Sequence, residues 1–230
     1  MKLVAFETSG KTGSVAAAWG ANADLSIRQK VLPQSSRSAQ SLAPTLADLI
    51  RDLGWQAHDL QAVAVASGPG SFTGLRVGVT TAKLLAYAAG CQVVEVNTLA
   101  TIAHQASQDA PADSPVWAIL DAQRGELFGA KFRAGNQEVP TQIISRERWL
   151  EMLAPGDTVA GPVLDRLAGE LPAGVRVASQ TSWLPTAATV ARLAVPLAQQ
   201  GVFTDPLELV PRYHRLSAAE EKAMRAESEG

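Results

Sequence analysis

The order of β-prone and helical segments most constrains the fold of this chain, because the same order occurs twice. In the first half, short apolar runs at residues 4–6 and 14–19 flank a turn-rich segment at 9–13, which predicts a β-hairpin. In the second half, residues 116–120 and 126–132 flank another turn-rich segment and predict a second hairpin. Helices and strands then alternate in each half. This pattern predicts an α/β fold made of two duplicated α/β units.

The spacing of apolar residues predicts the individual elements. After a third strand near residues 25–31, leucines at 42, 46, 49 and 53 share one face of a helix that stops at Gly54. Strands are expected at 61–66 and 92–96, with helices at 75–89 and 99–106. The second half predicts helices near 146–153, 164–171 and 187–199, and strands at 158–160 and 175–178.

A polar break at residues 108–115 is the expected boundary between the two units. We therefore expect an N-terminal α/β subdomain at residues 1–108 and a second α/β subdomain at 109–216. Residues 217–230 carry four glutamates, one lysine and one arginine. This composition predicts a charged, disordered tail.

Composition excludes several classes of protein. With 47% hydrophobic and 18% charged residues the chain is typical of globular proteins, and its net charge of −2 gives no overall attraction to nucleic acid. Cys91 is the single cysteine, so no intrachain disulfide can form. The first apolar run meets Glu7 too soon for a signal-peptide core, and no later run has membrane-spanning length. A cytoplasmic protein without a membrane partner is expected.

The segment SGPGSFTGLRVG at residues 67–78 joins a predicted strand to a predicted helix, where free backbone N–H groups suit an anion. Three residues separate Gly70 from Gly74, whereas a P-loop needs four and then Lys-Ser/Thr. A dinucleotide fingerprint needs a glycine at the position of Thr73. The segment is therefore either a tight turn that lets a helix pack closely or a nucleotide site. The candidate nucleotide-binding residues are Glu7, Gly68, Gly70, Ser71, Gly74 and Arg76.

Residue spacing does not favour a nucleophile or a metal site. Cys91 begins a predicted buried strand with no motif around it, which is typical of an inert core thiol. Ser71 lacks the two glycines of a nucleophile elbow. The histidines His58, His104 and His214 lie too far apart in the sequence to form a local metal pair. We expect no catalytic residue and no metal ligand.

Residues 67–86, SGPGSFTGLRVGVTTAKLLA, closely resemble the signature of the bacterial TsaB (YeaZ) family, a subunit of the tRNA threonylcarbamoyladenosine machinery. The segments VAFETSGKTGSVAAAW, LDAQRGELFGAKF and LVPRYHRLSAAE are also similar to parts of that family. The resemblance implies an ASKHA fold, the duplicated α/β architecture of actin, Hsp70 and sugar kinases. Glu7 stands where relatives usually carry aspartate. In ASKHA kinases an acid at this point helps hold metal and phosphate, so the longer side chain would change its reach. The alternative is that Glu7 is a hairpin-end acid bonded to the local hydroxyls of Thr8 and Ser9.

The resemblance also implies a role. It implies a non-catalytic scaffold that docks its paralogue TsaD as a heterodimer, allows the ATPase TsaE to join, and meets tRNA only through the complex. It implies no cofactor of its own, with ATP or ADP at a subunit interface as an alternative, and a homodimer when the partner is missing. The two N-terminal helices would form the docking face. The expected partner-binding residues are Ala39, Leu42, Ala43, Leu46, Leu49, Thr73, Val79, Ala82, Lys83, Ala86 and Tyr87.

Two other functions stay open. An active ASKHA phosphotransferase would use Glu7 and the glycine loop with ATP and magnesium. Asp121 and Gly161-Pro162 are its candidates on the other side of the cleft. Direct tRNA binding would use the short basic cluster Arg212, His214 and Arg215.

Overall fold

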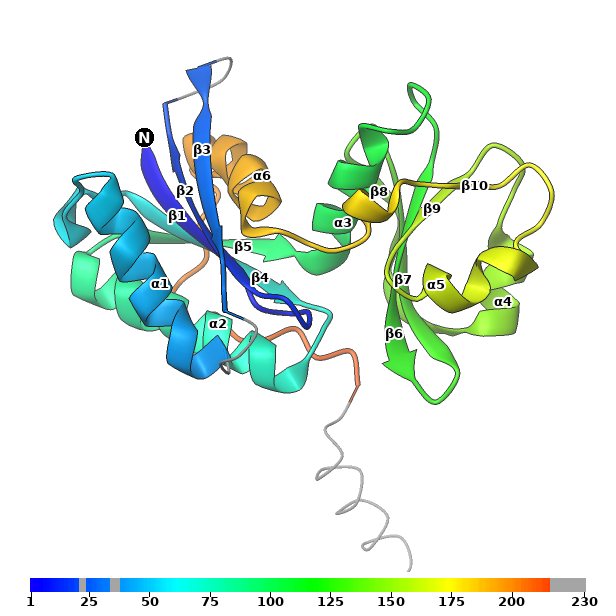
Figure 1. Ribbon diagram of the computed structural model, residues 1–230, viewed down its shortest axis with the longest axis horizontal. Helices are drawn as coiled ribbons and strands as arrows, with labels where there is room; N and C mark the ends of the chain where they lie inside the picture. The colour runs from blue at the N-terminus through cyan, green and yellow to red at the C-terminus, as the bar shows by residue number, and fades with distance from the viewer. Residues whose placement is uncertain (21–23, 34–37, 216–230) are drawn as a thin grey trace, which may run out of the picture.

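The computed structural model describes residues 1–20, 24–33 and 38–215, and it has two lobes side by side, each with a five-stranded sheet (Figure 1). The first half of the chain forms β1 (Lys2–Glu7), β2 (Ser14–Trp19), β3 (Ser26–Val31), α1 (Ser38–Asp52), η2 (Ala57–Asp59), β4 (Ala62–Gly68), α2 (Phe72–Ala89), β5 (Gln92–Asn97) and α3 (Thr98–Ser107). The second half forms β6 (Val116–Gln123), β7 (Glu126–Arg133), β8 (Asn136–Ser145), α4 (Arg146–Met152), β9 (Thr158–Ala160), α5 (Leu164–Leu167), η3 (Ala168–Glu170), β10 (Arg176–Val177), η4 (Gln180–Ser182) and α6 (Ala187–Gln199). The predicted tail at 217–230 lies outside the described residues.

The two sheets have the same topology. The first has the strand order β3-β2-β1-β4-β5, and the second has β10-β9-β6-β7-β8, which is the same order read from the other end. In each sheet three strands form an antiparallel meander, and the remaining two run parallel to the first strand of that meander. The prediction of two duplicated α/β units is confirmed.

The N-terminal sheet is covered on both faces, which explains the apolar runs in its strands. Every residue of β4, AVAVASG, is buried, as expected for a parallel strand with helices on both sides. One face packs against the leucines of α1 and the apolar side of α2. The other face packs against α6 through a layer of small residues, mainly alanine and valine. Small side chains allow this helix to approach the sheet closely.

The two lobes exchange one helix each, which corrects the predicted boundary at residue 108. Helix α3 belongs to the predicted first subdomain, yet Leu99, Ile102 and Ala106 pack in the core of the second sheet with Trp117. Helix α6 belongs to the predicted second subdomain, yet it covers the first sheet. Each helix has an apolar face, and sequence spacing does not tell which sheet that face will meet.

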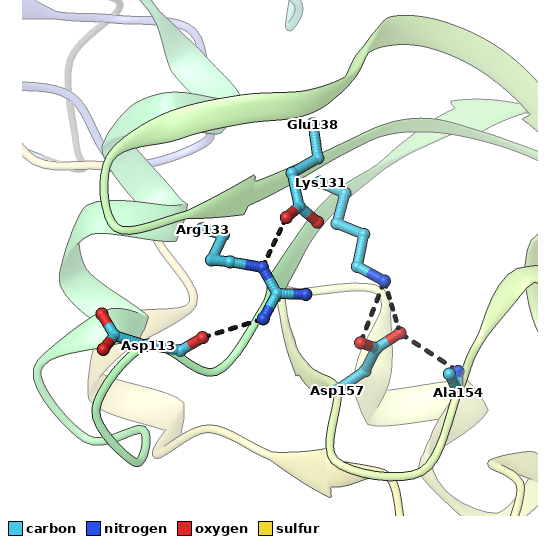
Figure 2. Close-up of polar contacts among 6 residues, drawn as sticks. All are labelled: Asp113, Lys131, Arg133, Glu138, Ala154 and Asp157. Carbon is cyan, nitrogen blue, oxygen red and sulfur yellow. Dashed lines mark hydrogen bonds and ion pairs between the residues drawn. The ribbon is translucent and has the colours of Figure 1, made fainter.

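In the second lobe, a nearly buried ion pair ties β7 to the turn before β9 (Figure 2). The Lys131 ammonium lies 3.0 Å from the Asp157 carboxylate, whose side chain is 3% exposed. The backbone N–H of Ala154 donates to the same carboxylate at 3.1 Å. The Lys131 ammonium also lies 5.8 Å from the centre of the Trp117 ring. The attraction between the two charges, together with the hydrogen bond from Ala154, offsets the cost of removing them from water.

Most predicted elements are present with shifts of one to three residues at their ends. Strand β8 was not predicted, because its sequence NQEVPTQIIS is largely polar and its residues are mostly exposed or half-buried at the edge of the sheet. Among the described residues, no helix is both long and apolar enough to cross a membrane.

Candidate functional site: the glycine loop and the docking helices

The glycine loop forms the start of α2. The Ser71 hydroxyl accepts a hydrogen bond from the backbone N–H of Gly74 at 3.3 Å and so caps the first turn. At the other end, Gly90 adopts a left-handed conformation with φ of 65° and ends the helix. The local sequence therefore explains both ends of α2.

The turn between β1 and β2 is seated against this loop. The backbone N–H of Ser71 donates to the Ser9 carbonyl at 2.7 Å, and the Thr8 hydroxyl donates to the Gly74 carbonyl at 2.7 Å. A Cβ on Gly70 would lie 2.6 Å from the Ser9 Cβ, and one on Gly74 would overlap the Thr8 carbonyl oxygen. The glycines therefore allow close packing of protein against protein, which is the tight-turn interpretation.

Glu7 is a buried acid behind this turn. Its side chain has no solvent exposure, and its Oε1 accepts hydrogen bonds from the Ser9 N–H at 2.7 Å and from the Ser9 hydroxyl. No described group bonds to Oε2. Burial raises the pKa of Glu7 to about 7, and the bonds from Ser9 and Gly10 oppose the rise only in part. The carboxyl is enclosed behind the turn, where Ser9 holds one of its two oxygens.

The predicted nucleotide residues lie around one turn, but most of them pack against other parts of the chain. Gly68 lies against the carbonyl of Arg212, since a Cβ there would come within 2.7 Å of that oxygen. Arg76 donates from Nε to the Tyr213 hydroxyl at 2.8 Å. Of the candidates, Ser71 and Arg76 are exposed, whereas Glu7 is fully buried, which favours the alternative of a hairpin-end acid bonded to local hydroxyls. Nucleotide contact by Ser71 and Arg76 stays a prediction.

The phosphotransferase candidates in the second lobe, Asp121 and Gly161, are also in contact with other residues of that lobe. Asp121, at the end of β6, accepts a bond from Arg166 at 2.7 Å and another from the Gln123 N–H at 2.7 Å. Burial alone would raise the pKa of Asp121, but the bonds from Arg166 and Gln123 lower it below its usual value. A Cβ on Gly161 would overlap the Ile119 carbonyl oxygen. This loop, too, is packed against its own lobe.

Part of the predicted docking face is buried, and this corrects the prediction. The side chains that cannot reach a partner are Leu42, Leu46, Leu49, Val79, Ala82 and Ala86. They pack together between the two helices and the first sheet, because an apolar stripe faces its own core. Ala39, Ala43, Thr73 and Tyr87 are exposed and Lys83 is half-buried, and their contact with a partner stays a prediction.

Helix α2 presents an outward stripe that the sequence analysis recognised only in part. Thr73, Thr80, Leu84 and Tyr87 are spaced by seven, four and three residues, so they lie on one side of the helix. Leu84 is 64% exposed and Tyr87 is 90% exposed. Leu84 was missed, although its spacing from Thr73 and Tyr87 could have indicated it.

Residues 200–215, here called the C-terminal strap, run from α6 back along α2 and on toward the second lobe (Figure 1). The Arg212 N–H donates to the Ser67 carbonyl at 2.8 Å, and the Arg212 guanidinium forms two bonds with the Glu95 carboxylate. Arg215 pairs with Glu126 at the start of β7. His214 lies near Phe128, and burial lowers the pKa of its imidazole. The basic cluster considered for tRNA binding therefore has both of its arginines paired within the chain.

A cavity of about 490 Å³ lies between the lobes, near the carboxyl ends of β4 and β5. Its lining side chains are all polar and come from both lobes and the strap: Ser67, Glu95, Asn97, Gln137, Thr141, Thr204, Arg212 and His214. The Asn97 amide donates to the Thr141 hydroxyl across the cleft at 3.0 Å. Glu95 and Arg212 form an ion pair in the cavity wall, so their charges neutralise each other.

Reactive side chains do not converge elsewhere in the described residues. No group of three or more histidine, cysteine, aspartate or glutamate side chains that could hold a metal occurs within 1–20, 24–33 and 38–215. The Cys91 thiol is buried, which raises its pKa and makes it a weak nucleophile.

The fold defines the class of protein. Two sheets of identical strand order, joined by exchanged helices, make this an ASKHA-type protein with a duplicated α/β architecture. The glycine loop and the acid of its first hairpin are packed internally.

Comparison with known proteins identifies the family. A family model described as "TsaD: tRNA N6-adenosine threonylcarbamoyltransferase" matches residues 25–224. The "tRNA threonylcarbamoyladenosine biosynthesis protein TsaB" of Bacillus subtilis (strain 168) is 32% identical over 161 residues, which are 68% of this chain and 68% of that protein. The protein of the same name from Escherichia coli (strain K12) is 32% identical over 133 residues, 58% of this chain and 55% of that one. The solved structure "YeaZ from Pseudomonas aeruginosa" has a TM-score of 0.75 at 25% identity and covers 92% of this chain and 99% of its own. The chain belongs to the TsaB (YeaZ) family.

Proposed function

We propose that this chain acts in tRNA threonylcarbamoyladenosine biosynthesis as a non-catalytic scaffold. In this proposal α1 and α2 dock a TsaD-type transferase, TsaE joins the resulting complex, and tRNA is modified by the partner. Family membership supports the pathway, since the matched relatives are named for it. The observation that carries the scaffold role is the outward stripe of α2, where Leu84 and Tyr87 are exposed without any contact that the core requires.

The packing of the glycine loop supports a non-catalytic role. A phosphotransferase needs backbone N–H groups aimed at a phosphate, but the Ser71 N–H is bonded to Ser9 and the Gly74 N–H to Ser71. Glu7 is enclosed and has no solvent exposure, so its carboxylate is not presented to a bound phosphate or metal. In this proposal the loop instead fixes the start of the docking helix. ATP or ADP at the interface stays a prediction, and nucleotide binding that appears only when the partner is present would support it.

The test is sedimentation velocity of the chain mixed with TsaD from the same source. The variants Ala43→Arg on α1 and Tyr87→Asp on α2 change exposed residues of the docking face, and Leu184→Asp changes an exposed residue of the second lobe. We expect a complex with the unaltered chain and with Leu184→Asp, and at least about tenfold weaker binding by the two face variants. The same samples are assayed for threonylcarbamoyladenosine in tRNA by mass spectrometry of nucleosides.

A failure of the unaltered chain to bind TsaD would refute the proposal. Sedimentation of the chain alone measures the expected homodimer, and its loss in the same two variants would mean that both assemblies use one face. Full tRNA modification with a variant that no longer binds would also refute the scaffold role.

A further inference from the structure

Large apolar side chains are exposed on two segments that are far apart in the sequence. On α2 these are Leu84 and Tyr87. On the C-terminal strap they include Leu207 and Val210, which are 85% and 51% exposed, beside Val202, Phe203 and Tyr213. An exposed group of large apolar residues is a common mark of an interaction site.

The two segments lie side by side. The Lys83 ammonium donates to the carbonyls of Leu207 and Leu209, at 3.4 and 3.2 Å. Tyr87 is one helical turn beyond Lys83 on the same side of α2. Further along, the rings of Phe72 and Tyr213 stack with centroids 4.3 Å apart. The strap therefore follows α2 from near its C-terminal end to its first turn.

One buried residue anchors the strap between two exposed apolar residues. Leu209 has no solvent exposure and packs in the core between the helices and the first sheet. Two residues before it and one residue after it, Leu207 and Val210 are exposed. The Leu207 N–H is held by the Asp205 carboxylate at 2.8 Å. The outward apolar side chains are thus presented on an anchored backbone.

The size of a stable interface requires more surface than α1 and α2 expose. Specific complexes use roughly 20 to 30 residues on each side. The exposed residues of the two helices are fewer than this, and on α1 several are alanines, such as Ala39, Ala43 and Ala47. The strap is the apolar surface that adjoins the outward side of α2, and a partner seated on α2 would meet it.

We propose that the docking surface continues from α2 onto the C-terminal strap, and that Leu207 and Val210 are anchor residues for the same TsaD-type partner. The inference rests on the proposed function, because it assumes that α2 faces this partner. The partner surface that meets the strap is apolar. Leu207 and Val210 pack against this apolar surface of the partner, and Leu84 and Tyr87 pack against the neighbouring partner surface that faces α2.

The test compares the affinity for TsaD of the unaltered full chain with that of three variants, by isothermal titration calorimetry. The strap variant is the double substitution Leu207→Ser and Val210→Ser, the helix variant is Tyr87→Ser, and the control is Leu184→Ser in the second lobe. All four side chains are exposed, so the variants should fold, which circular dichroism and the thermal midpoint check. We expect the strap variant to bind about tenfold more weakly or worse, and the control to stay within about twofold of the unaltered chain.

The outcomes separate this inference from the proposed function. If Tyr87→Ser weakens binding and the strap variant does not, the strap inference is wrong and the docking role stands. If the unaltered chain does not bind TsaD, the proposed function itself fails. If the strap variant changes only self-association of the chain, the occupant is a second copy and the inference is overturned. Slower backbone hydrogen exchange at residues 205–213 upon TsaD binding, absent in the strap variant, would support the inference independently.

Discussion

Glu7→Gln should remove a pH dependence from the stability of the protein. Glu7 is fully buried, and its pKa rises from 4.5 to about 7 in the folded chain. At about 1.36 kcal/mol per pKa unit, this rise corresponds to about 3 kcal/mol of preference for the protonated carboxyl. The folded pKa is above the unfolded pKa, so the stabilisation is complete below pH 4.5 and is lost as pH rises toward 7. The loss should reach about 2 kcal/mol at pH 6 and about 3 kcal/mol at pH 8.

Glutamine does not titrate, so the free energy of unfolding of the variant lacks this contribution. The amide also changes the bonds to Ser9 and leaves N–H groups at the unpartnered Oε2 position, which adds a cost at every pH. That constant cost cancels when the difference between variant and unaltered chain is compared across pH. Urea unfolding followed by tryptophan fluorescence at pH 4.5, 6 and 8 measures this difference. It should move by about 3 kcal/mol in favour of the variant.

The control is Glu147→Gln, an exposed acid in the first turn of α4. It should leave the pH dependence of unfolding unchanged. Stability curves for the Glu7→Gln variant and the unaltered chain that run parallel from pH 4.5 to 8 would refute the reasoning. The buried carboxyl would then be ionised throughout, with a partner or a solvent path that the described contacts lack.

Two further predictions concern packing and charge. Gly74→Ala should lower the free energy of unfolding by about 3 kcal/mol or more, because its Cβ would overlap the backbone of the β1–β2 turn, whereas Gly10→Ala, with nothing within 4 Å of its Cβ, should be nearly neutral in urea unfolding. Lys131→Met should cost about 3 kcal/mol by leaving Asp157 buried without its cation, whereas Arg148→Ala, from an exposed pair, should cost less than about 1 kcal/mol by thermal unfolding. Equal effects within either pair would contradict the corresponding argument.

Periodic apolar residues were sufficient to predict most of the fold. The leucines of α1 and the apolar runs of β1, β4 and β5 mark segments that are buried by their own lobe, where local pattern and global packing agree. Strand β8 and the C-terminal strap were missed because they lack a periodic apolar face. The strap is held instead by individual contacts, such as the burial of Leu209 and the Arg212–Glu95 pair, between residues far apart in the sequence.

The candidate site was predicted less well than the fold, for a related reason. The stripe of large apolar residues on α1 was interpreted as a docking face, yet a helix lying on a sheet buries that stripe in its own core. The surface left for a partner consists of small residues on α1, such as Ala43, and of the sparse stripe of α2 that includes Leu84 and Tyr87, which gives a weaker signal in a single sequence than the leucines. The bonds from Ser9 to Glu7 are those of a hairpin-end acid held by local hydroxyls, which the sequence suggested, whereas the bond from the Ser71 N–H to the Ser9 carbonyl depends on how the turn meets α2 and was missed.

The exchange of α3 and α6 between the lobes affects how the protein can fold during its synthesis on the ribosome. The strands of the first sheet are complete by Asn97, but α6, which covers one face of that sheet, ends at Gln199. At a synthesis rate of about 5 to 20 residues per second, the residues between Asn97 and Gln199 take roughly 5 to 20 seconds to make, and α6 cannot cover that face before then. During this interval the nascent chain exposes an apolar surface that includes Leu3, Val94 and Val96. Until nearly the whole chain has emerged, the N-terminal half therefore keeps an apolar sheet face that can bind other apolar surfaces.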